Sequence, residues 1–217
     1  MMYYLSFSIS SNCGLSAAAE HLQNKIVTLN VINSTDFNTV IAFTLARDID
    51  AMRNDFAKDF KTVYIARGKK AAFINGTKIS HGIVPAMISE QIIPLYPIFA
   101  ENGSEWFNAI VLEKEHIDNF VALIEKKNNI ETLDYERIRN GDSMFSIIKN
   151  ANRGIFTLEL TETERRIVNS SLRQGFFSWP RSYDLTSISR EFGLTKPTIL
   201  YHIRNAERKV MEALFGS

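Results

Sequence analysis

The sequence predicts an α+β domain followed by an all-helical one. Residues 1 to about 140 alternate short β-branched and aromatic runs with amphipathic helical stretches, the pattern of strands mixed with helices. After the stretch "RNGDS" at 139–143 the character changes, and the remainder is almost wholly helical. We therefore expect one domain over residues 1–150 and a second over residues 151–217.

Composition limits the classes of protein to which the chain can belong. It has 217 residues, 45% hydrophobic and 23% charged, with a net charge of +1, as in ordinary globular proteins with room for two domains. Because the chain as a whole has almost no net charge, any positively charged surface that attracts nucleic acid has to be confined to one part of the molecule. The N-terminus "MMYYLSFSIS" has no basic region and no apolar run is long enough to span a membrane, so we expect a cytoplasmic protein.

The first part of the chain predicts a ferredoxin-like arrangement. A strand, a helix, two strands, a helix and a strand are expected in this order at 3–10, 14–23, 25–33, 39–46, 48–60 and 61–67. One face of the second helix carries Ile49, Met52, Phe56 and Phe60. The order βαββαβ is typical of an α+β sandwich in which two helices cover one face of an antiparallel sheet.

A partial second copy of the same unit is expected before residue 140. The segments 94–100 and 105–112 flank "ENGS", whose Asn-Gly pair favours a β-hairpin. A helix at 114–127 and a strand at 130–138 follow. Three prolines, Pro85, Pro94 and Pro97, predict loop or edge strand over residues 80–97, since proline cannot donate a ladder hydrogen bond.

The helical domain begins with a capping box. Thr161 is followed three residues later by Glu164, which predicts the start of a helix, and Gly175 suits its end. We expect its apolar side at Ile167, Val168 and Leu172. The aromatic connector Phe176, Phe177 and Trp179 is expected to pack on the small core, and a second helix at 185–192 ends at Gly193.

A third helix follows a tight turn. Gly193 and Leu194 make the turn, Thr195 is the expected N-cap, and Pro197 is tolerated in the first turn because the amides there lack partners within the helix. At about 100° per residue, one inward stripe is expected at Ile199, Ile203, Ala206, Val210 and Leu214. The opposite side carries Pro197, Thr198, Tyr201, Arg204, Asn205 and Arg208.

A short helix, a glycine turn and a second helix with a polar outer face predict a helix-turn-helix whose second helix enters the DNA major groove. Arg204 suits guanine and Asn205 suits adenine, whereas Lys196, Arg208 and Lys209 suit phosphates. The competing interpretation is an ordinary solvated helix face. The candidate DNA-binding residues are Thr195, Lys196, Pro197, Thr198, Tyr201, Arg204, Asn205, Arg208 and Lys209.

Residues 158–215 also resemble the helix-turn-helix domain of the archaeal bacterio-opsin activator family and, more distantly, region four of bacterial sigma factors. The resemblance rests on the opening "LTETE", the connector "GFF" and "WPR", the turn "EFGLTK" and the ending "AERKVMEALF". The family has Ala in place of Ser189, Ser or Thr in place of Pro197, and polar residues in place of Leu200 and Tyr201, so the base preference does not carry over. The resemblance implies a transcription regulator whose preceding part is a regulatory or assembly domain.

We therefore expect a transcription regulator that binds double-stranded DNA as a homodimer. The N-terminal domain is expected to pair sheet edges across a two-fold axis, to sense a small-molecule effector, or both. One alternative is a metabolite-binding or catalytic α+β protein with a helical oligomerisation tail. Another is an adaptor that binds the basal transcription machinery instead of DNA.

No enzymatic activity, cofactor or metal is expected. The sequence contains no phosphate loop, nucleophile elbow or HExxH motif. Cys13, the single cysteine, and His21 are two residues and make no metal site, so a buried thiol is the expected role of Cys13.

Overall fold

A computed structural model of the chain describes residues 1–10, 13–45, 49, 52–79 and 82–216. The chain divides into two compact units, Met1–Gly154 and Ile155–Ser217. In the described part of the chain, every helix is too short or too polar to cross a membrane.

The N-terminal unit repeats the order βαββαβ twice. The first copy consists of β1 (Tyr3–Ser10), α1 (Gly14–Leu22), β2 (Ile26–Asn33), β3 (Phe37–Thr44), α2 (Arg53–Phe56) and β4 (Phe60–Arg67). The second copy consists of β5 (Ala72–Ile79), α3 (Ile83–Ser89), β6 (Ile92–Glu101), β7 (Ser104–Val111), α4 (Lys114–Ile124) and β8 (Asn129–Arg137). The second copy, expected to be partial, therefore contains all six elements.

All eight strands form one antiparallel sheet in the order β4-β5-β3-β2-β6-β7-β1-β8. The first strand of each copy lies among the strands of the other copy, so β5 separates β4 from β3 and β1 separates β7 from β8. The short turn between β4 and β5, closed by a hydrogen bond of 2.8 Å from the Gly68 amide to the Ala71 carbonyl, makes these strands hairpin neighbours. The expected separate sandwich over residues 3–67 is thus replaced by one continuous sheet.

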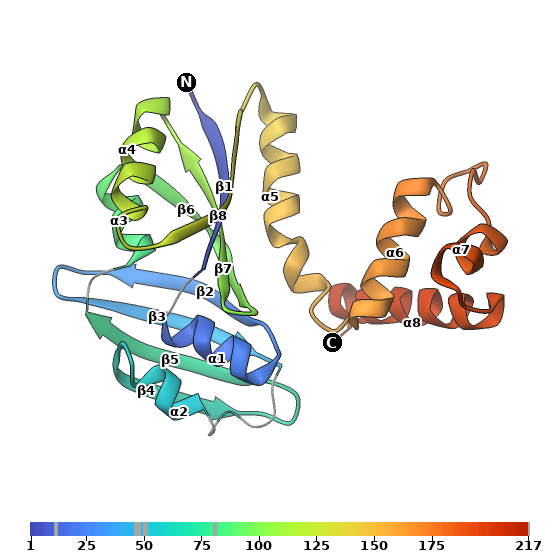
Figure 1. Ribbon diagram of the computed structural model, residues 1–217, viewed down its shortest axis with the longest axis horizontal. Helices are drawn as coiled ribbons and strands as arrows, with labels where there is room; N and C mark the ends of the chain where they lie inside the picture. Colours follow the sequence, from blue (N-terminus) through green and yellow to red (C-terminus); the bar gives the residue numbers. More distant parts are fainter. Residues whose placement is uncertain (11–12, 46–48, 50–51, 80–81, 217) are drawn as a thin grey trace. The chain divides into compact units, whose positions relative to one another are not determined.

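Helices cover the two faces of this sheet unequally. Figure 1 shows α3 and α4 on one side of β1, β6 and β7, and α5 (Gly141–Phe156) on the other. The core beneath α3 and α4 includes Leu5, Phe7 and Phe120, and the core beneath α1 and α2 includes Ala42, Met52 and Ile74. On the other face, Ile147 of α5 packs against Ile110 and Ile138. A Cβ atom on Gly154 would lie 2.2 Å from the Phe99 ring, so glycine lets the end of α5 approach β6 closely.

Two predicted segments differ from the structure. The helix expected at 48–60 is present as α2 alone, and Phe60 begins β4 instead of ending a helix; residues 48, 50 and 51 lie outside the described residues. The loop or edge strand expected at 80–97 contains α3 and the interior strand β6, with residues 80 and 81 outside the described residues.

The prolines are compatible with an interior strand because β6 is irregular. Its pairing with β7 shifts register between Leu95 and Phe99, and its pairing with β2 is confined to Ile98–Ala100. Pro94 and Pro97 therefore lie outside the stretch shared with β2, where their missing amide protons break no ladder bond to that strand.

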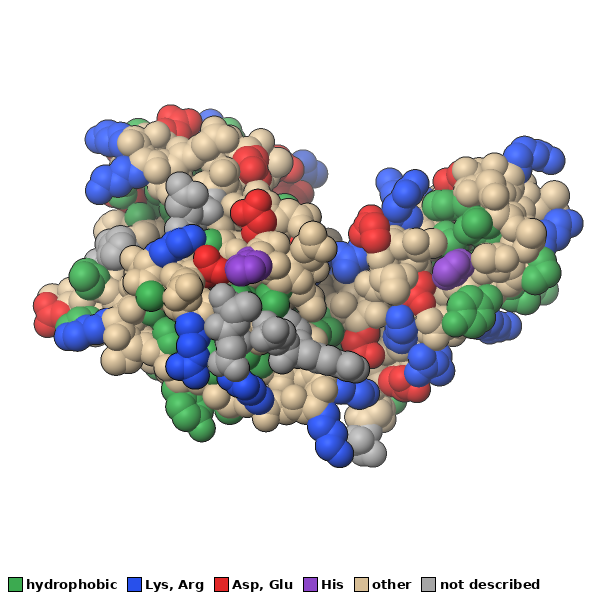
Figure 2. Space-filling model, turned by 60° about the horizontal axis from the view of Figure 1, so that its bottom comes forward, with side chains coloured by type: hydrophobic (Ala, Val, Ile, Leu, Met, Phe, Trp, Pro, Cys, Tyr) green, Lys and Arg blue, Asp and Glu red, His purple; other side chains and the backbone are tan. Residues whose placement is uncertain are grey.

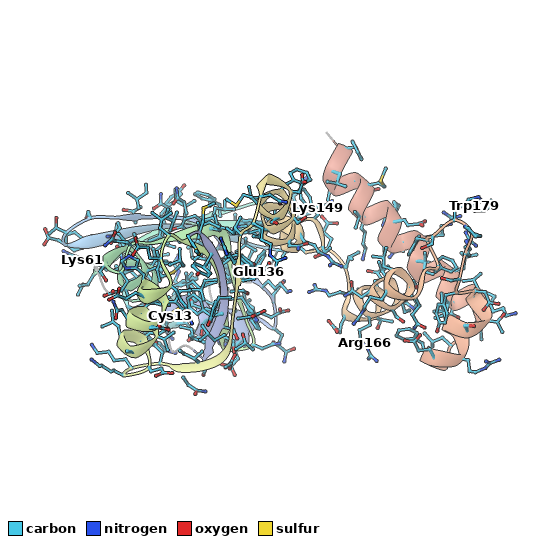
Figure 3. The ribbon with its side chains drawn as sticks, turned by 90° about the horizontal axis from the view of Figure 1, so that it is seen from above. Cys13, Lys61, Glu136, Lys149, Arg166 and Trp179 are labelled. Carbon is cyan, nitrogen blue, oxygen red and sulfur yellow. The ribbon has the colours of Figure 1, made fainter. Side chains whose placement is uncertain are left out.

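The C-terminal unit contains α6 (Glu162–Gln174), α7 (Leu185–Phe192) and α8 (Lys196–Phe215). A small core joins them, made of Ile167, Phe176, Ile188, Ile199 and Ile203. Leu172, expected on the apolar side of α6, is 51% exposed, and the small Ser171 is buried in its place. In the connector only Phe176 is buried, whereas Phe177 is 41% and Trp179 95% exposed, so the expectation that all three pack inward was wrong for the last two. Figure 3 labels Trp179, which lies in the connector between α6 and α7.

Candidate nucleic-acid interface

The turn before α8 has the geometry that the sequence predicts. Gly193 ends α7 in the left-handed conformation at φ 64°, and the Leu194 amide donates to the Ser189 carbonyl at 3.1 Å. The hydroxyl of Thr195 caps α8 by accepting from the Thr198 amide at 3.4 Å, with Pro197 in the first turn. These contacts set where α8 begins relative to α7.

The inward stripe of α8 covers only its first half. Ile199, Ile203 and Ala206 are buried, as expected. Val210 is half-buried, and Leu214 is 46% exposed although it was expected inside. The core of this unit is too small to cover a helix of 20 residues, so the last turns of α8 extend past it.

The side of α8 opposite the core carries an aromatic ring and two guanidinium groups. Pro197, Tyr201, Arg204 and Arg208 are exposed there, with Tyr201 at 66%. Arg204 pairs with Glu207 at 2.8 Å and Arg208 with Glu212 at 2.6 Å, both along the same helix. Exposed pairs of this kind contribute only about 0.2–0.5 kcal/mol, so an anionic partner can replace the carboxylates at little cost.

The first turn of α8 adds a second group of exposed polar side chains. Thr195 and Lys196 are exposed, and the Thr198 hydroxyl lies 2.8 Å from that of Thr195. The first amides of a helix point outward without partners in the helix, and an adjacent cation favours a phosphate at such a position. Lys and Arg side chains are also spread over the visible face of the unit in Figure 2.

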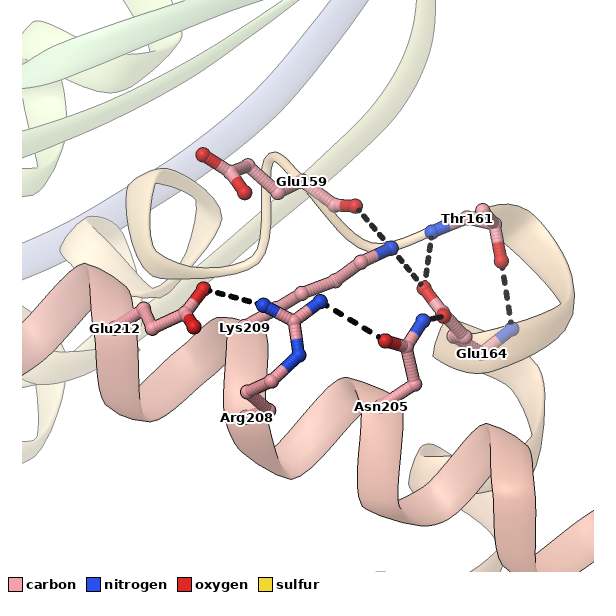
Figure 4. A network of polar contacts seen from close by, with 7 residues as sticks. All are labelled: Glu159, Thr161, Glu164, Asn205, Arg208, Lys209 and Glu212. Atoms are coloured by element: carbon pink, nitrogen blue, oxygen red, sulfur yellow. Dashed lines mark hydrogen bonds and ion pairs between the residues drawn. The ribbon is translucent and has the colours of Figure 1, made fainter.

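Two other candidate residues, Asn205 and Lys209, belong to an internal network (Figure 4). Its centre is Glu164, which is 2% exposed. Lys209 Nζ donates to Glu164 Oε2 at 2.8 Å and to the Glu159 carbonyl at 3.0 Å. Asn205 Nδ2 donates to Glu164 Oε1, and its own Oδ1 accepts from Arg208 at 3.0 Å. Both side chains therefore hold α8 against the start of α6.

Glu164 also completes the predicted capping box. The Thr161 amide donates to Glu164 Oε2 at 2.9 Å, and the Glu164 amide donates to the Thr161 hydroxyl at 3.2 Å. Burial raises the pKa of the Glu164 carboxyl, but the hydrogen bonds from Lys209, Thr161 and Asn205 outweigh it and hold that pKa below its ordinary value. The capping box can be predicted from the sequence because its two residues are close together. The partners of Glu164 on α8 lie more than 40 positions away, so no local pattern predicts them.

A second carboxylate joins α6 to α7. Glu191 accepts from Ser170 at 2.7 Å, from Gln174 at 2.9 Å and from Tyr183 at 2.6 Å. The hydrogen bond from Tyr183 is the main reason why the pKa of Glu191 is lowered. Sequence analysis did not single out this residue, whose partners come from α6 and from the connector that follows it.

Comparison with known proteins identifies the fold of this unit. Residues 160–212 match a family model described as "HTH DNA binding domain". The C-terminal unit carries an HTH DNA-binding domain of the bacterio-opsin activator type. A stretch of 57 residues is 37% identical to a protein of Haloferax volcanii described as "Putative transcriptional regulator". That stretch is 26% of this chain and only 10% of the relative, so the similarity covers a small part of either protein.

Proposed function

We propose that the protein is a DNA-binding transcription regulator that reads the major groove with the outer face of α8. The observation that carries the proposal is an exposed face with Tyr201 and Arg204 on the second helix of a helix-turn-helix, within the matched domain. A DNA-binding role implies a cytoplasmic protein and a regulator instead of an enzyme. The proposed interface comprises Thr195, Lys196, Pro197, Thr198, Tyr201, Arg204, Asn205, Arg208 and Lys209.

We assign different roles to these residues. Arg204 is placed to contact a base edge, because its guanidinium is exposed near the middle of the outer face. Lys196 and Arg208 flank it and contact phosphates on either side. Asn205 and Lys209 act mainly by holding α8 on α6, since both already bind Glu164.

The proposal is tested by fluorescence anisotropy of the full-length chain with a pool of random duplex DNA at several salt concentrations. Binding should weaken as salt rises, because each phosphate neutralised by a cation releases counterion. Lys196→Ala should reduce the salt slope by about one. Arg139→Ala, in the N-terminal unit, is the control and should leave binding unchanged. Absence of salt-dependent binding by the unaltered chain would overturn the proposal.

We also propose that the N-terminal unit is a pair of ferredoxin-like sandwiches that have exchanged their first strands, and that it dimerises the protein. A single helix-turn-helix contacts few base pairs, so useful specificity favours two half-sites about one DNA turn apart. The surface we assign is the face of β3, β4 and β5 opposite α1 and α2. In register, it carries Phe43 beside Phe73 and Phe37 beside Ile79.

The chemistry of this sheet face supports contact with a second copy of the same chain. Tyr64 is 69%, Ile79 60% and Phe73 40% exposed, although they lie within strands. In the described part of these strands, the alternating residues on this face are all uncharged. Lys61 lies beside them, with its Nζ 4.8 Å from the centroid of the Phe37 ring. A face with one lysine and otherwise uncharged side chains, several of them exposed aromatic or aliphatic ones, can lie against its own copy with little repulsion between like charges.

A role as an adaptor of the basal transcription machinery remains the second candidate. The observation in its favour is the exposure of Trp179 at 95%, because tryptophan is enriched where proteins bind other proteins. Anisotropy with duplex DNA separates the two candidates. An adaptor that binds the machinery instead of DNA should show no salt-dependent DNA binding, and Trp179→Ala should weaken its binding to the protein partner.

A further inference from the structure

A cavity in the N-terminal unit lies at the seam between the two halves of the sheet. Its volume is about 440 Å³, within the range of small-molecule sites. One half contributes Cys13 at the start of α1 and Lys78 of β5, and the other contributes Val84 of α3 and Glu105 of β7. A molecule bound there would therefore touch both halves.

The wall of the cavity is mixed, with polar and charged side chains beside a group of apolar ones. Val40, Ile98 and Phe107 line it from three different strands, and Leu15 lines it from α1. These side chains belong to the two main cores, so their positions are fixed by packing. This apolar group suits an apolar body of moderate size.

One of the two lysines that line the cavity, Lys78, has unused hydrogen-bonding capacity. The Lys78 side chain is 16% exposed, and its ammonium donates one long hydrogen bond of 3.4 Å to Asp59 Oδ2. Burial lowers the pKa of Lys78, but nearby Cys13, Asp59 and Glu105 outweigh it, so the amine stays charged. An ammonium has three donors, and among the described residues only Asp59 accepts from this one. The other oxygen of Asp59 accepts from the Gly14 amide at 3.1 Å.

The cavity also contains a carboxylate that no described residue binds. Glu105 is half-buried on the same face of the sheet as Phe107 and makes no hydrogen bond or ion pair with the described part of the chain. A half-buried carboxylate without donors is costly and gains from an ammonium supplied by a ligand. The cavity thus offers an ammonium and a carboxylate, each with unused hydrogen-bonding capacity, beside a group of apolar side chains.

We propose that this cavity binds a small zwitterion of the α-amino acid type. The ligand carboxylate pairs with Lys78, the ligand ammonium pairs with Glu105, and its apolar side chain contacts Val40, Ile98 and Phe107. The role of this ligand as an effector rests on the proposed function, but the binding itself does not.

The test measures binding without DNA, so its failure is distinguishable from failure of the DNA-binding proposal. The full-length chain is titrated by calorimetry with each of the twenty proteinogenic L-amino acids. The tightest binder is then compared with its deaminated acid and its decarboxylated amine, which for leucine are 4-methylpentanoate and 3-methylbutylamine. The zwitterion should bind about ten- to a hundredfold more tightly than either analogue, because each analogue leaves one buried charge unpaired.

The variant Glu105→Gln gives the sharpest control. It removes a carboxylate that makes no hydrogen bond or ion pair with the described residues, and Asp59 stays beside Lys78, so folding should be unaffected while affinity for the amino acid falls at least about tenfold. Glu125→Gln, an exposed carboxylate at the end of α4, should change nothing. The proposal is overturned if no amino acid binds, if the acid or the amine binds as tightly as the zwitterion, or if Glu105→Gln binds normally.

Discussion

The ammonium of Lys209 on α8 lies 2.8 Å from the buried carboxylate of Glu164 on α6. The two side chains are 17% and 3% exposed, so the pair is largely shielded from water. Because Glu164 also caps α6, this contact links the start of one helix to the middle of another. A residue that sequence analysis assigns to DNA phosphates is thus also a structural residue of the domain.

Lys209→Met should destabilise the C-terminal unit by about 3 kcal/mol, because it leaves the charge of Glu164 buried with fewer donors. Urea unfolding followed by far-ultraviolet circular dichroism, which reports the loss of helix, measures this. Lys196→Met, an exposed lysine on the same helix, should change the free energy of unfolding by less than about 0.5 kcal/mol. Equal effects of the two variants would show that the pair with Glu164 does not matter.

Stability of the C-terminal unit should fall in acid because of Glu164. Its pKa is lowered in the folded protein, so its contribution is complete above its ordinary pKa of about 4.3 and is lost as the pH falls through the lower folded value. Urea unfolding between pH 3 and pH 6 should show this loss. Glu164→Gln should have a flatter pH profile, and a profile identical to that of the unaltered chain would contradict the assignment.

Arg204→Ala should lower discrimination between a selected site and random DNA by about 1–3 kcal/mol, because a guanidinium on a base edge carries sequence information. Competition anisotropy with the two DNAs measures the ratio. Lys196→Ala should instead weaken binding to both DNAs alike. If Arg204→Ala also weakened binding to the selected site and to random DNA equally, that result would indicate that Arg204 contacts a phosphate and not a base.

Phe73→Lys should dissociate the proposed dimer, because it places a buried cation against its own copy on the sheet face. Sedimentation equilibrium measures the molecular mass. Leu123→Lys on α4 is a matched control, since Leu123 is 39% and Phe73 40% exposed, and it should leave the mass unchanged. A chain that is monomeric without any substitution would rule out the dimer.

Local signals predicted most of the elements and the start of the candidate site. The Asn-Gly pair gave the β6–β7 hairpin, where Asn102 and Gly103 have φ of 52° and 78°. Thr161 with Glu164, and Gly193 with Thr195, marked the starts of α6 and α8 correctly. Each of these signals acts within a few residues, so it can be detected without knowledge of the fold.

Longer-range pairing was outside the reach of sequence patterns. No pattern in the segment 72–79 predicts that β5 lies between β4 and β3. Strand order depends on which strands pair after each hairpin has formed. The prolines of β6 suggested a sheet edge, whereas the register shift in that strand keeps it inside the sheet. The cavity between the halves follows from this exchange of strands, since its lining comes from both copies.

The sequence by itself determined the two classes of domain, the starts of α6 and α8 and most of the outer face of α8, because capping, periodicity and turn chemistry are local properties. Tertiary structure decided that Asn205 and Lys209 turn toward Glu164 and that Lys78 and Glu105 share one cavity. In each case the packing of segments distant in the chain decided whether a charged or polar side chain has a partner. Such pairings depend on which surfaces are buried together, and burial is settled only when the elements assemble.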